Sequence, residues 1–252
     1  MSKVNIVYLD IETSPNISYT WDGMWEVDVV GFKQEWYILS FAYKQEGKRT
    51  EVKALNDYEL YKKDKTNDRE LVKDIWNILD GADIIVGHNI DRFDIRKINA
   101  RFLYHGLALP STYKTVDTLK IARKMFQLNS NKLGHIAKHL GIGDKVNTGG
   151  FQLWLDCMAG NTPAWNLMKK YNKHDTDLTE QVYKKLRPFS TNHPNLNVLK
   201  GTTHNCSNCG SNSIQKRGFT ITKTNKYQRY QCQSCGSWST GERIVIDKVI
   251  VK

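Results

Sequence analysis

The sequence predicts an α/β domain built on a mixed β-sheet, followed by a small C-terminal domain. Along the first 190 residues, short apolar runs alternate with longer segments of helical period, as in folds with helices on the faces of a sheet. The first three strand-like runs follow one another directly, which indicates an antiparallel edge. The composition changes beyond two prolines, and four of the five cysteines follow. We expect domains at residues 1–190 and 203–252, with a linker at 191–202.

The first expected strand, residues 4–11, ends in two acids. It is rich in β-branched and aromatic side chains, as is typical of a strand buried on both faces. Asp10 and Glu12 interrupt this run, and because side chains alternate along a strand, their carboxylates point the same way. Two like charges held that close need a cation between them or shifted pKa values. The pair is therefore a candidate metal site; the alternative is a polar strand end before the turn at 13–15.

Two further strands are expected near the N-terminus. The strand-like runs at 36–43 and 49–55 flank a polar turn at 45–48, so they are expected to pair. The stretch 16–34 shows no clean period, and we interpret it as an ordered loop in which three large side chains pack, namely Trp21, Met24 and Trp25.

The middle of the chain predicts a helix, a strand and a second helix. Asn67 and Glu70 have the spacing of a capping box, and apolar residues at helical period follow them. A short apolar strand at 82–86 and a helix that begins near Arg92 come next. Asp94 then lies in the first turn of this helix, just beyond a strand end, where open α/β sheets place their sites.

The remaining elements of the first domain are mostly helical. A helix is expected to end near Phe126, with Asp117 as its cap. We interpret the segment 145–160 as irregular. Two more helices are expected at 131–140 and 163–186.

The net charge of +11 is unevenly distributed along the chain. Residues from 191 onward carry nine lysines or arginines against two acids, a balance of +7, which leaves +4 for the first 190 residues. A basic C-terminal segment favours a polyanionic partner, most commonly nucleic acid. Because the sequence shows no signal peptide and no run of 18 apolar residues, we expect a cytoplasmic protein with no membrane partner.

The most specific motif is Cys206-x2-Cys209 followed by Cys232-x2-Cys235. Two CxxC pairs separated by a predicted hairpin match the four-thiolate site of a zinc ribbon. In a reducing cytosol, metal binding is favoured over disulfides. A segment this small has little hydrophobic core, so we expect one structural Zn²⁺ to fold it. A redox pair or an iron centre is the alternative.

Basic and aromatic side chains are interleaved through the predicted ribbon. They are Lys216, Arg217, Lys223, Lys226 and Arg229, with Phe219, Tyr227, Tyr230 and Trp238. Cations bind phosphates and aromatic rings stack on bases, so the ribbon is expected to bind nucleic acid. The alternative interpretation is that these rings form the small core of the ribbon.

Two more acids stand in contexts that suit the pair at the first strand. Hydrolysis of a phosphodiester with two divalent ions needs about four carboxylates around the ions. Asp94 follows a strand, and Asp175 lies in a predicted helix. Tyr171 precedes Asp175 by one turn and shares its face of the helix, so its hydroxyl is placed to hold an attacking water.

Three motifs in this order resemble the exonuclease motifs of the DEDD superfamily. They are D-I-E-T at 10–13, G-x-N-I-x-x-F-D at 87–94 and Y-x-x-x-D at 171–175. The sequence is similar to the 3′→5′ proofreading domain of family B DNA polymerases and their free-standing relatives, in the subclass with tyrosine in the last motif. The resemblance covers residues 1–190 and implies a ribonuclease H-like mixed sheet flanked by helices.

The resemblance also implies an activity and a set of site residues. It implies a two-metal 3′→5′ exonuclease that releases nucleoside monophosphates, with two Mg²⁺ or Mn²⁺ ions held by Asp10, Glu12, Asp94 and Asp175. Tyr171 would position the nucleophilic water, and Asn89 and Phe93 would contact the 3′-terminal nucleotide. The expected substrate is 3′-ended, single-stranded DNA in replication or repair, and a replication protein or polymerase is a candidate partner.

The sequence departs from the polymerases in one respect, because the zinc ribbon follows where a polymerase palm and fingers would be. Three alternatives stay open. A related exoribonuclease would carry the same carboxylates and act on RNA. A non-catalytic adaptor would only bind nucleic acid or a replication protein. A resolvase- or transposase-type nuclease would share the fold, but such sites generally carry a single acid on the first strand, unlike Asp10 with Glu12.

Overall fold

The structure is a computed structural model that describes residues 4–21 and 28–245. The expected packing positions Met24 and Trp25 lie outside the described residues. The chain divides into two compact units, which are described in turn: Asn5–Lys120 with Asn129–Val182, and Ile121–Leu128 with the chain from Tyr183. The domain bounds given above remain a prediction.

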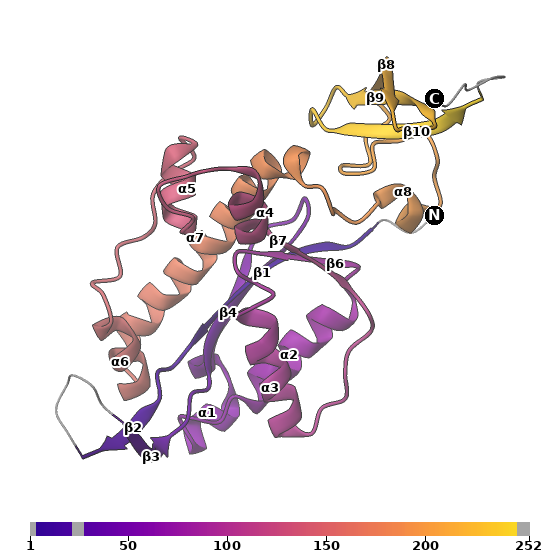
Figure 1. The fold of residues 1–252 in the computed structure, drawn as a ribbon. Helices are drawn as coiled ribbons and strands as arrows, with labels where there is room; N and C mark the ends of the chain where they lie inside the picture. Colours follow the sequence, from indigo (N-terminus) through magenta and orange to yellow (C-terminus); the bar gives the residue numbers. More distant parts are fainter. Residues whose placement is uncertain (1–3, 22–27, 246–252) are drawn as a thin grey trace. The chain divides into compact units, whose positions relative to one another are not determined.

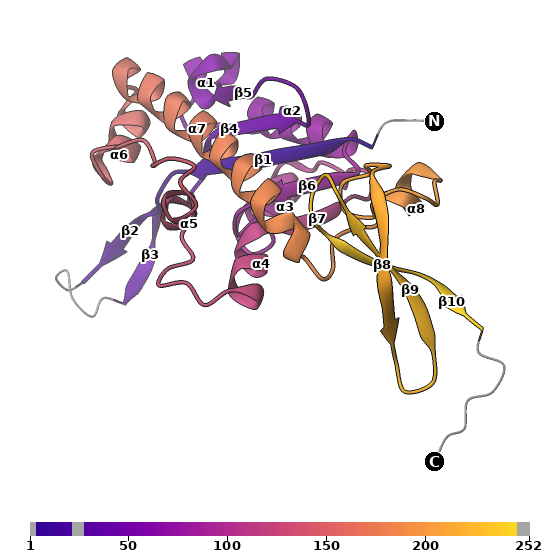
Figure 2. The ribbon, with the colours of Figure 1, turned by 90° about the horizontal axis from the view of Figure 1, so that it is seen from above.

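A five-stranded mixed sheet forms the centre of the first unit, in the order β5-β4-β1-β6-β7 (Figures 1 and 2). The central strand β1 pairs antiparallel with β4 and parallel with β6, while β5 and β7 form the edges. The bounds are β1 Ile6–Thr13, β4 Ile38–Gln45, β5 Glu51–Ala54, β6 Ile84–Gly87 and β7 Lys114–Asp117. The predicted α/β class with an antiparallel edge is therefore confirmed.

The register of β1 places its two acids on one face of the sheet. Asp10 lies opposite Ala42 and Glu12 opposite Ser40. The intervening Ile11 points to the other face and is buried in the hydrophobic core. The parallel pairing of β1 with β6 ends at Tyr8 and Val86, so the last residues of β1 leave backbone groups for other partners on that side.

Helices cover both faces of this sheet (Figures 1 and 2). On one side α2 (Arg69–Asp80) packs against α3 (Asp94–His105), and both contribute to the hydrophobic core beneath β1 and β4. On the other side α7 (Thr162–Leu186) runs along β1 and β4, and Thr176 Oγ1 donates a hydrogen bond to the Ala42 carbonyl at 3.4 Å. The other helices are α1 Glu59–Lys63, α4 Thr118–Met125, α5 Leu133–His139, α6 Gln152–Ala159 and α8 Leu196–Lys200.

A buried carboxylate joins α2, α3 and β4. Asp68 Oδ2 accepts hydrogen bonds from the Ile38 amide at 2.9 Å and from Arg101 Nε at 2.8 Å. His105 Nε2 lies 2.6 Å from the other carboxylate oxygen. Because a buried charge is tolerated only when it is paired and hydrogen-bonded, this group fixes how the two helices meet the start of β4.

The capping box expected at the start of α2 is wrong. The N-cap is Asp68, without a side-chain cap, and Asn67 Oδ1 accepts only the Arg69 amide, at 3.2 Å. Glu70 Oε2 instead accepts the Leu60 amide at 2.8 Å. The glutamate therefore ties α2 to α1, a tertiary contact that local spacing does not reveal.

Two segments that were expected to be irregular contain regular elements. Within 16–34, β2 (Ile17–Thr20) pairs antiparallel with β3 (Val29–Gln34), so this stretch is a hairpin rather than a loop. Trp21 is 88% exposed, so its expected packing role is also wrong. Within 145–160, residues Gln152–Ala159 form α6. The remaining expected strands and helices of the first unit are confirmed, with bounds that differ by a few residues.

The second unit contains a separate three-stranded antiparallel sheet in the order β10-β9-β8, visible at the yellow end of the chain in Figure 2. Its strands are β8 Ile214–Ile221, β9 Lys226–Cys232 and β10 Trp238–Ile244. The first two are the predicted hairpin, and the third was not expected. Within the described ranges, no helix has both the length and the apolar character needed to cross a membrane.

Candidate active site and metal centre

Asp10 is held in place by a buried amide on α7. Asn172 Nδ2 donates to Asp10 Oδ2 at 2.6 Å and to the Asp10 carbonyl at 3.2 Å. Asn172 Oδ1 in turn accepts from Ser40 Oγ at 3.0 Å, so every polar atom of the buried amide group has a partner. This chain fixes the orientation of the Asp10 carboxylate relative to β4 and α7.

Asp94 reaches the same end of β1 from the first turn of α3. Its Oδ1 accepts a hydrogen bond from the Ile11 amide at 3.0 Å, and its side chain is buried. Ile11 lies beyond the last residue of β1 that pairs with β6, so the carboxylate replaces a strand partner there. Asp94 is thereby joined to the backbone between the two acids of β1.

Tyr171 and Asp175 are four residues apart on α7 and share a partner, the ammonium of Lys145. Lys145 Nζ lies 3.1 Å from Tyr171 Oη and makes a short ion pair with Asp175 Oδ2. Asp175 is buried, and its Oδ1 has no hydrogen-bond partner among the described residues. Lys145 lies in the aperiodic segment between α5 and α6, where no sequence pattern predicted a role for it.

The acids raise one another's pKa values. Burial raises the pKa of Asp10 to about 7, with the charge of Asp175 adding to this effect and Lys145 and Asn172 opposing it. Burial and the charge of Asp10 also raise the pKa values of Glu12 and Asp94 well above the usual range. The four carboxylates therefore form one electrostatic group, and a cation bound among them would stabilise their charged forms.

Asn89 and Phe93 lie in the turn between β6 and α3. Asn89 has a φ of +68°, a left-handed conformation that is uncommon outside glycine, and its carbonyl accepts the Phe93 amide at 3.0 Å. The Phe93 ring is 38% exposed. The preceding Gly87 is required, because a Cβ there would lie 2.5 Å from the Ile90 side chain. The motif G-x-N-I thus has a packing explanation independent of function.

Asp117 holds this turn against β7. Its Oδ1 accepts the Asn89 amide at 2.9 Å and the Leu119 amide at 2.9 Å, and Oδ2 lies 3.4 Å from the Asp91 amide. The predicted capping role of Asp117 is confirmed, since Leu119 belongs to the first turn of α4. The contacts with the 89–91 turn are an additional role that was not predicted.

The donor set at β1, α3 and α7 fits a hard divalent cation. Four carboxylates offer oxygen ligands of the kind that Mg²⁺ and Mn²⁺ prefer, and one buried oxygen of Asp175 lacks a partner. Among the described residues, the only clustered group of three or more candidate acidic, histidine or cysteine ligands is formed by the four cysteines described next, and the carboxylates are not gathered in this way. The assignment of ligands therefore remains a prediction.

Four cysteine side chains converge at one end of the C-terminal sheet. Their Sγ atoms all lie within 4.8 Å of one another, with Cys206 3.6 Å from Cys235 and Cys209 3.7 Å from Cys232. A tetrahedral Zn²⁺ with Zn–S bonds of about 2.3 Å places its sulfurs about 3.8 Å apart, whereas a disulfide requires about 2.05 Å. The cluster therefore fits a zinc ribbon and contains no disulfide.

Hydrogen bonds favour the thiolate form of Cys206. Burial alone would raise the pKa of this thiol, but the Ser237 hydroxyl and the amides of Asn208 and Cys209 lower it to about 7. Ser237 Oγ lies 3.2 Å from Cys206 Sγ and 3.0 Å from Cys235 Sγ. Thiolates are the zinc ligands, so these hydrogen bonds suit a metal site.

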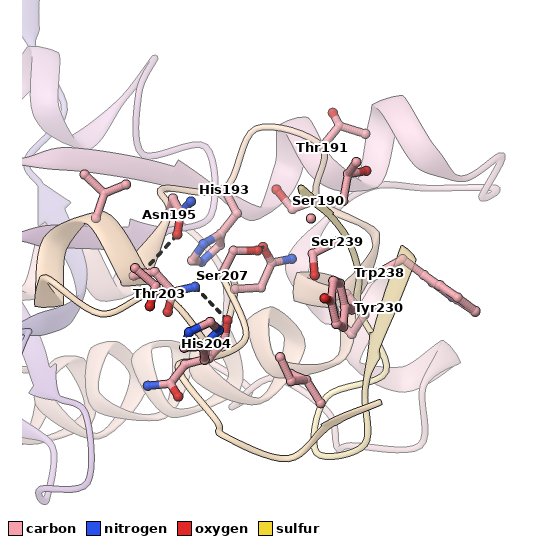
Figure 3. Close-up of a pocket in the computed structure, with 18 of the residues that line it drawn as sticks. Ser190, Thr191, His193, Asn195, Thr203, His204, Ser207, Tyr230, Trp238 and Ser239 are labelled. Carbon is pink, nitrogen blue, oxygen red and sulfur yellow. Dashed lines mark hydrogen bonds between the residues drawn. The ribbon is translucent and has the colours of Figure 1, made fainter. Parts of the chain in front are cut away.

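The second unit also contains a cavity of about 1000 Å³ with both polar and apolar lining residues (Figure 3). His193 and Asn195 lie on one side of it, and Tyr230 and Trp238 lie on the side of the sheet. Burial lowers the pKa of His193 to about 4, so this imidazole is neutral near pH 7. The described residues that line the cavity include Glu242 and no lysine or arginine.

A mixed sheet with acids at the end of its central strand is the arrangement of the ribonuclease H-like class. The family model described as the RNase_H superfamily matches residues 7–187. This match covers more than half of the chain, which therefore belongs to the RNase H superfamily.

Two similar proteins each match part of this chain. Protein NEN3 of Arabidopsis thaliana is 32% identical over 80 residues, which cover 31% of this chain and 16% of NEN3. The family B DNA polymerase from the hyperthermophilic archaeon Pyrobaculum calidifontis is 16% identical, with a TM-score of 0.55 over 74% of this chain and 25% of the polymerase chain. At that identity the likeness to the polymerase shows a shared fold.

Proposed function

We propose that this chain is a metal-dependent 3′→5′ exonuclease that hydrolyses phosphodiester bonds at the 3′ end of single-stranded DNA and releases nucleoside monophosphates. The observation that carries the proposal is the group of carboxylates on β1, α3 and α7, in which burial and neighbouring charges raise the pKa values of Asp10, Glu12 and Asp94. Holding several carboxylates close together lowers the stability of the folded protein, and acids with such raised pKa values are concentrated at functional sites. Membership of the RNase H superfamily and the fold shared with a DNA polymerase support a nuclease that acts on DNA.

In this proposal, Asp10, Glu12, Asp94 and Asp175 hold two Mg²⁺ or Mn²⁺ ions, and one Zn²⁺ is held by the four cysteines. The divalent ions would supply a nucleophile at neutral pH and stabilise charge on the leaving oxygen. Asn172 keeps the Asp10 carboxylate in place. Lys145 contributes a positive charge beside Asp175, where the negative phosphodiester would approach.

Tyr171 is proposed to hold the attacking water by its hydroxyl. Burial and the charge of Glu12 raise the pKa of Tyr171, so the hydroxyl keeps its proton and can donate a hydrogen bond. Trp154 packs against the Tyr171 ring with the ring centroids 6.0 Å apart, which limits movement of the hydroxyl. The exposed Phe93 ring and the Asn89 side chain would contact the terminal nucleotide.

The proposal is tested by a time course on 5′-labelled oligonucleotides with Mg²⁺ or Mn²⁺. Single-stranded DNA should shorten from its 3′ end in steps of one nucleotide, and matched duplex and RNA should be degraded more slowly. Products that appear at internal positions would indicate an endonuclease instead. A chain that binds DNA but leaves it intact with either metal would indicate the adaptor.

The Tyr171→Phe variant should lower kcat by about 10²-fold with little change in KM, because the ring packing is kept and only the hydroxyl that holds the water is lost. Single-turnover cleavage of a single-stranded substrate measures this effect. Tyr104→Phe on the exposed face of α3 is the control, and it should cleave at the wild-type rate. An unchanged kcat for Tyr171→Phe would remove Tyr171 from the site.

A further inference from the structure

We propose that one face of the β8–β10 sheet binds single-stranded nucleic acid, the substrate class of the proposed exonuclease, so the identity of the ligand rests on the proposed function. We name this surface the arginine face. It is formed by five side chains from all three strands: Arg217, Arg229, Arg243, Tyr227 and Trp238.

Strand pairing places these side chains on one side of the sheet. On β9, Tyr227 and Arg229 are two residues apart, so both point to the same face. Cross-strand neighbours share a face, and Arg243 lies opposite Tyr227. Trp238 lies opposite Gln231, and the bulged Arg217 donates from Nε to Gln231 Oε1 at 3.2 Å.

The arginine face is a surface of unpaired positive charge. All three of its arginines are exposed, and none makes an ion pair with any described residue. The only acid in the described ribbon, from residue 203 to 245, is Glu242. Phosphates are the natural partners of guanidinium groups in fixed positions, because the planar fork matches their oxygens.

The rings on this face are available for stacking. Trp238 is 48% exposed, and the Arg229 guanidinium lies 4.5 Å from the centre of its ring. Arg229 Nε donates to the Arg217 carbonyl at 3.1 Å, which holds the guanidinium in this position. An exposed indole next to a fixed cation can stack on a base while the cation contacts the adjacent phosphate. The interpretation of these rings as a ribbon core does not hold for Trp238.

The opposite face of the sheet is less suited to this role. There Tyr230 packs over Gly241, where an added Cβ would lie 2.4 Å from the ring. Lys226 on that face lies 4.0 Å from the Phe219 ring centre, and Lys216 is its other cation. On its strands the opposite face therefore has two described cations, fewer than the three arginines of the arginine face.

Stacking on Trp238 requires a base whose face is exposed, and bases in a duplex are stacked on each other. The arginine face should therefore prefer a single strand to a duplex. Nothing on this face reads a 2′-hydroxyl, so single-stranded DNA and RNA should bind similarly.

The test measures binding to the full chain by fluorescence anisotropy, with a labelled dT oligonucleotide of about 16 nucleotides. All proteins carry Asp10→Asn, and no Mg²⁺ or Mn²⁺ is added, so that binding is measured without cleavage. The double variant Arg217→Gln/Arg229→Gln should weaken binding at least about tenfold and reduce the slope of log K against log salt by about 1.4, since each lost contact to a single strand removes about 0.7. Trp238→Ala should weaken binding about tenfold and leave the slope unchanged.

The matched control removes two charges from the opposite face, in Lys216→Gln/Lys226→Gln, and should weaken binding less than about threefold. Zinc content shows that each variant keeps its ribbon. If both double variants lost the same affinity for the oligonucleotide, the positive charge of the ribbon would attract DNA without a specific binding face, and the proposal would be overturned. Tighter binding of a matched duplex than of the single strand would also overturn it. Cleavage by the chain with Asp10 intact is measured separately, so a failed exonuclease assay contradicts the proposed function and leaves the binding result to stand.

Discussion

The Asp10→Asn variant should lose 3′→5′ cleavage by at least about 10³-fold, because the change removes a proposed metal ligand at the centre of the carboxylate group. The shape of the side chain is kept, and Asn172 can still contact the Oδ1 that asparagine retains. Release of nucleotides from a single-stranded oligonucleotide under saturating Mg²⁺ or Mn²⁺ measures the loss. Glu12→Gln on the same strand should have a comparable effect.

The control for this prediction is Glu59→Gln, which removes an exposed carboxylate that pairs with Lys62 on the surface of α1. It should cleave at the wild-type rate. If Asp10→Asn retained more than about a tenth of wild-type activity, the carboxylate group would not be the catalytic site, and another site would have to be found.

Asp10→Asn should also become more stable than the wild type as the pH rises, when no divalent ion is added. The folded-state pKa of Asp10 is about 7, above the ordinary value of 3.8. Below pH 3.8 the Asp10 carboxyl therefore does not lower the free energy of unfolding of the wild type. Between pH 3.8 and 7 it lowers this free energy increasingly, and above pH 7 the full loss of stability remains. Unfolding temperatures should be similar at pH 4 and higher for the variant at pH 8. If the unfolding temperature of the variant exceeded that of the wild type by the same amount at both pH values, titration of Asp10 would not be the cause.

The Cys232→Ala variant should lose the zinc and the structure of the β8–β10 sheet. Cys232 is buried at the end of β9, and its Sγ lies 3.7 Å from Cys209 Sγ. Structural zinc in such small domains supplies about 10–16 kcal/mol of apparent binding free energy, and the small ribbon has little else to hold it. The wild type should contain one zinc per chain and the variant close to none. Backbone amides of residues 206–244 should then lose protection from hydrogen exchange.

Cys157→Ala is the matched control, because Cys157 is a buried thiol in α6 and does not belong to the four-cysteine group. It should keep one zinc per chain and full protection in the ribbon. A Cys232→Ala protein with one tightly bound zinc and a protected sheet would show that the cluster does not depend on this ligand.

The sequence alone determined the residues with a local signature. Asp10 and Glu12 interrupt a strand, Asp94 follows a strand end, and Tyr171 and Asp175 are one helical turn apart, so their positions follow from the periods of strands and helices. The two CxxC pairs are likewise patterns within short stretches of the sequence, and they predicted the four-cysteine group. Each of these residues lies in the element in which it was expected.

Sequence patterns did not predict the strands and helices that lack a buried face or a clear apolar period. The strand β2 has only four residues and all its side chains are exposed, so its sequence is too short to mark a strand with a buried face, and its pairing with β3 is interrupted by bulges. In α6 only Leu153 and Cys157 are buried, which is too few positions to show a helical period. The strand β10 follows the last cysteine pair, where the zinc motif gave no indication of a third strand.

The tertiary structure alone decided which side chains support the acids. Asn172 contacts Asp10 across 162 residues, and Lys145 reaches Asp175 from an aperiodic segment, so neither contact leaves a trace in local spacing. The arginine face likewise depends on the register of three strands. The helical and strand periods of a sequence predict which way a side chain points within its own helix or strand. The residues that it contacts depend on how that element packs against the other elements, and this packing is seen only in the folded chain.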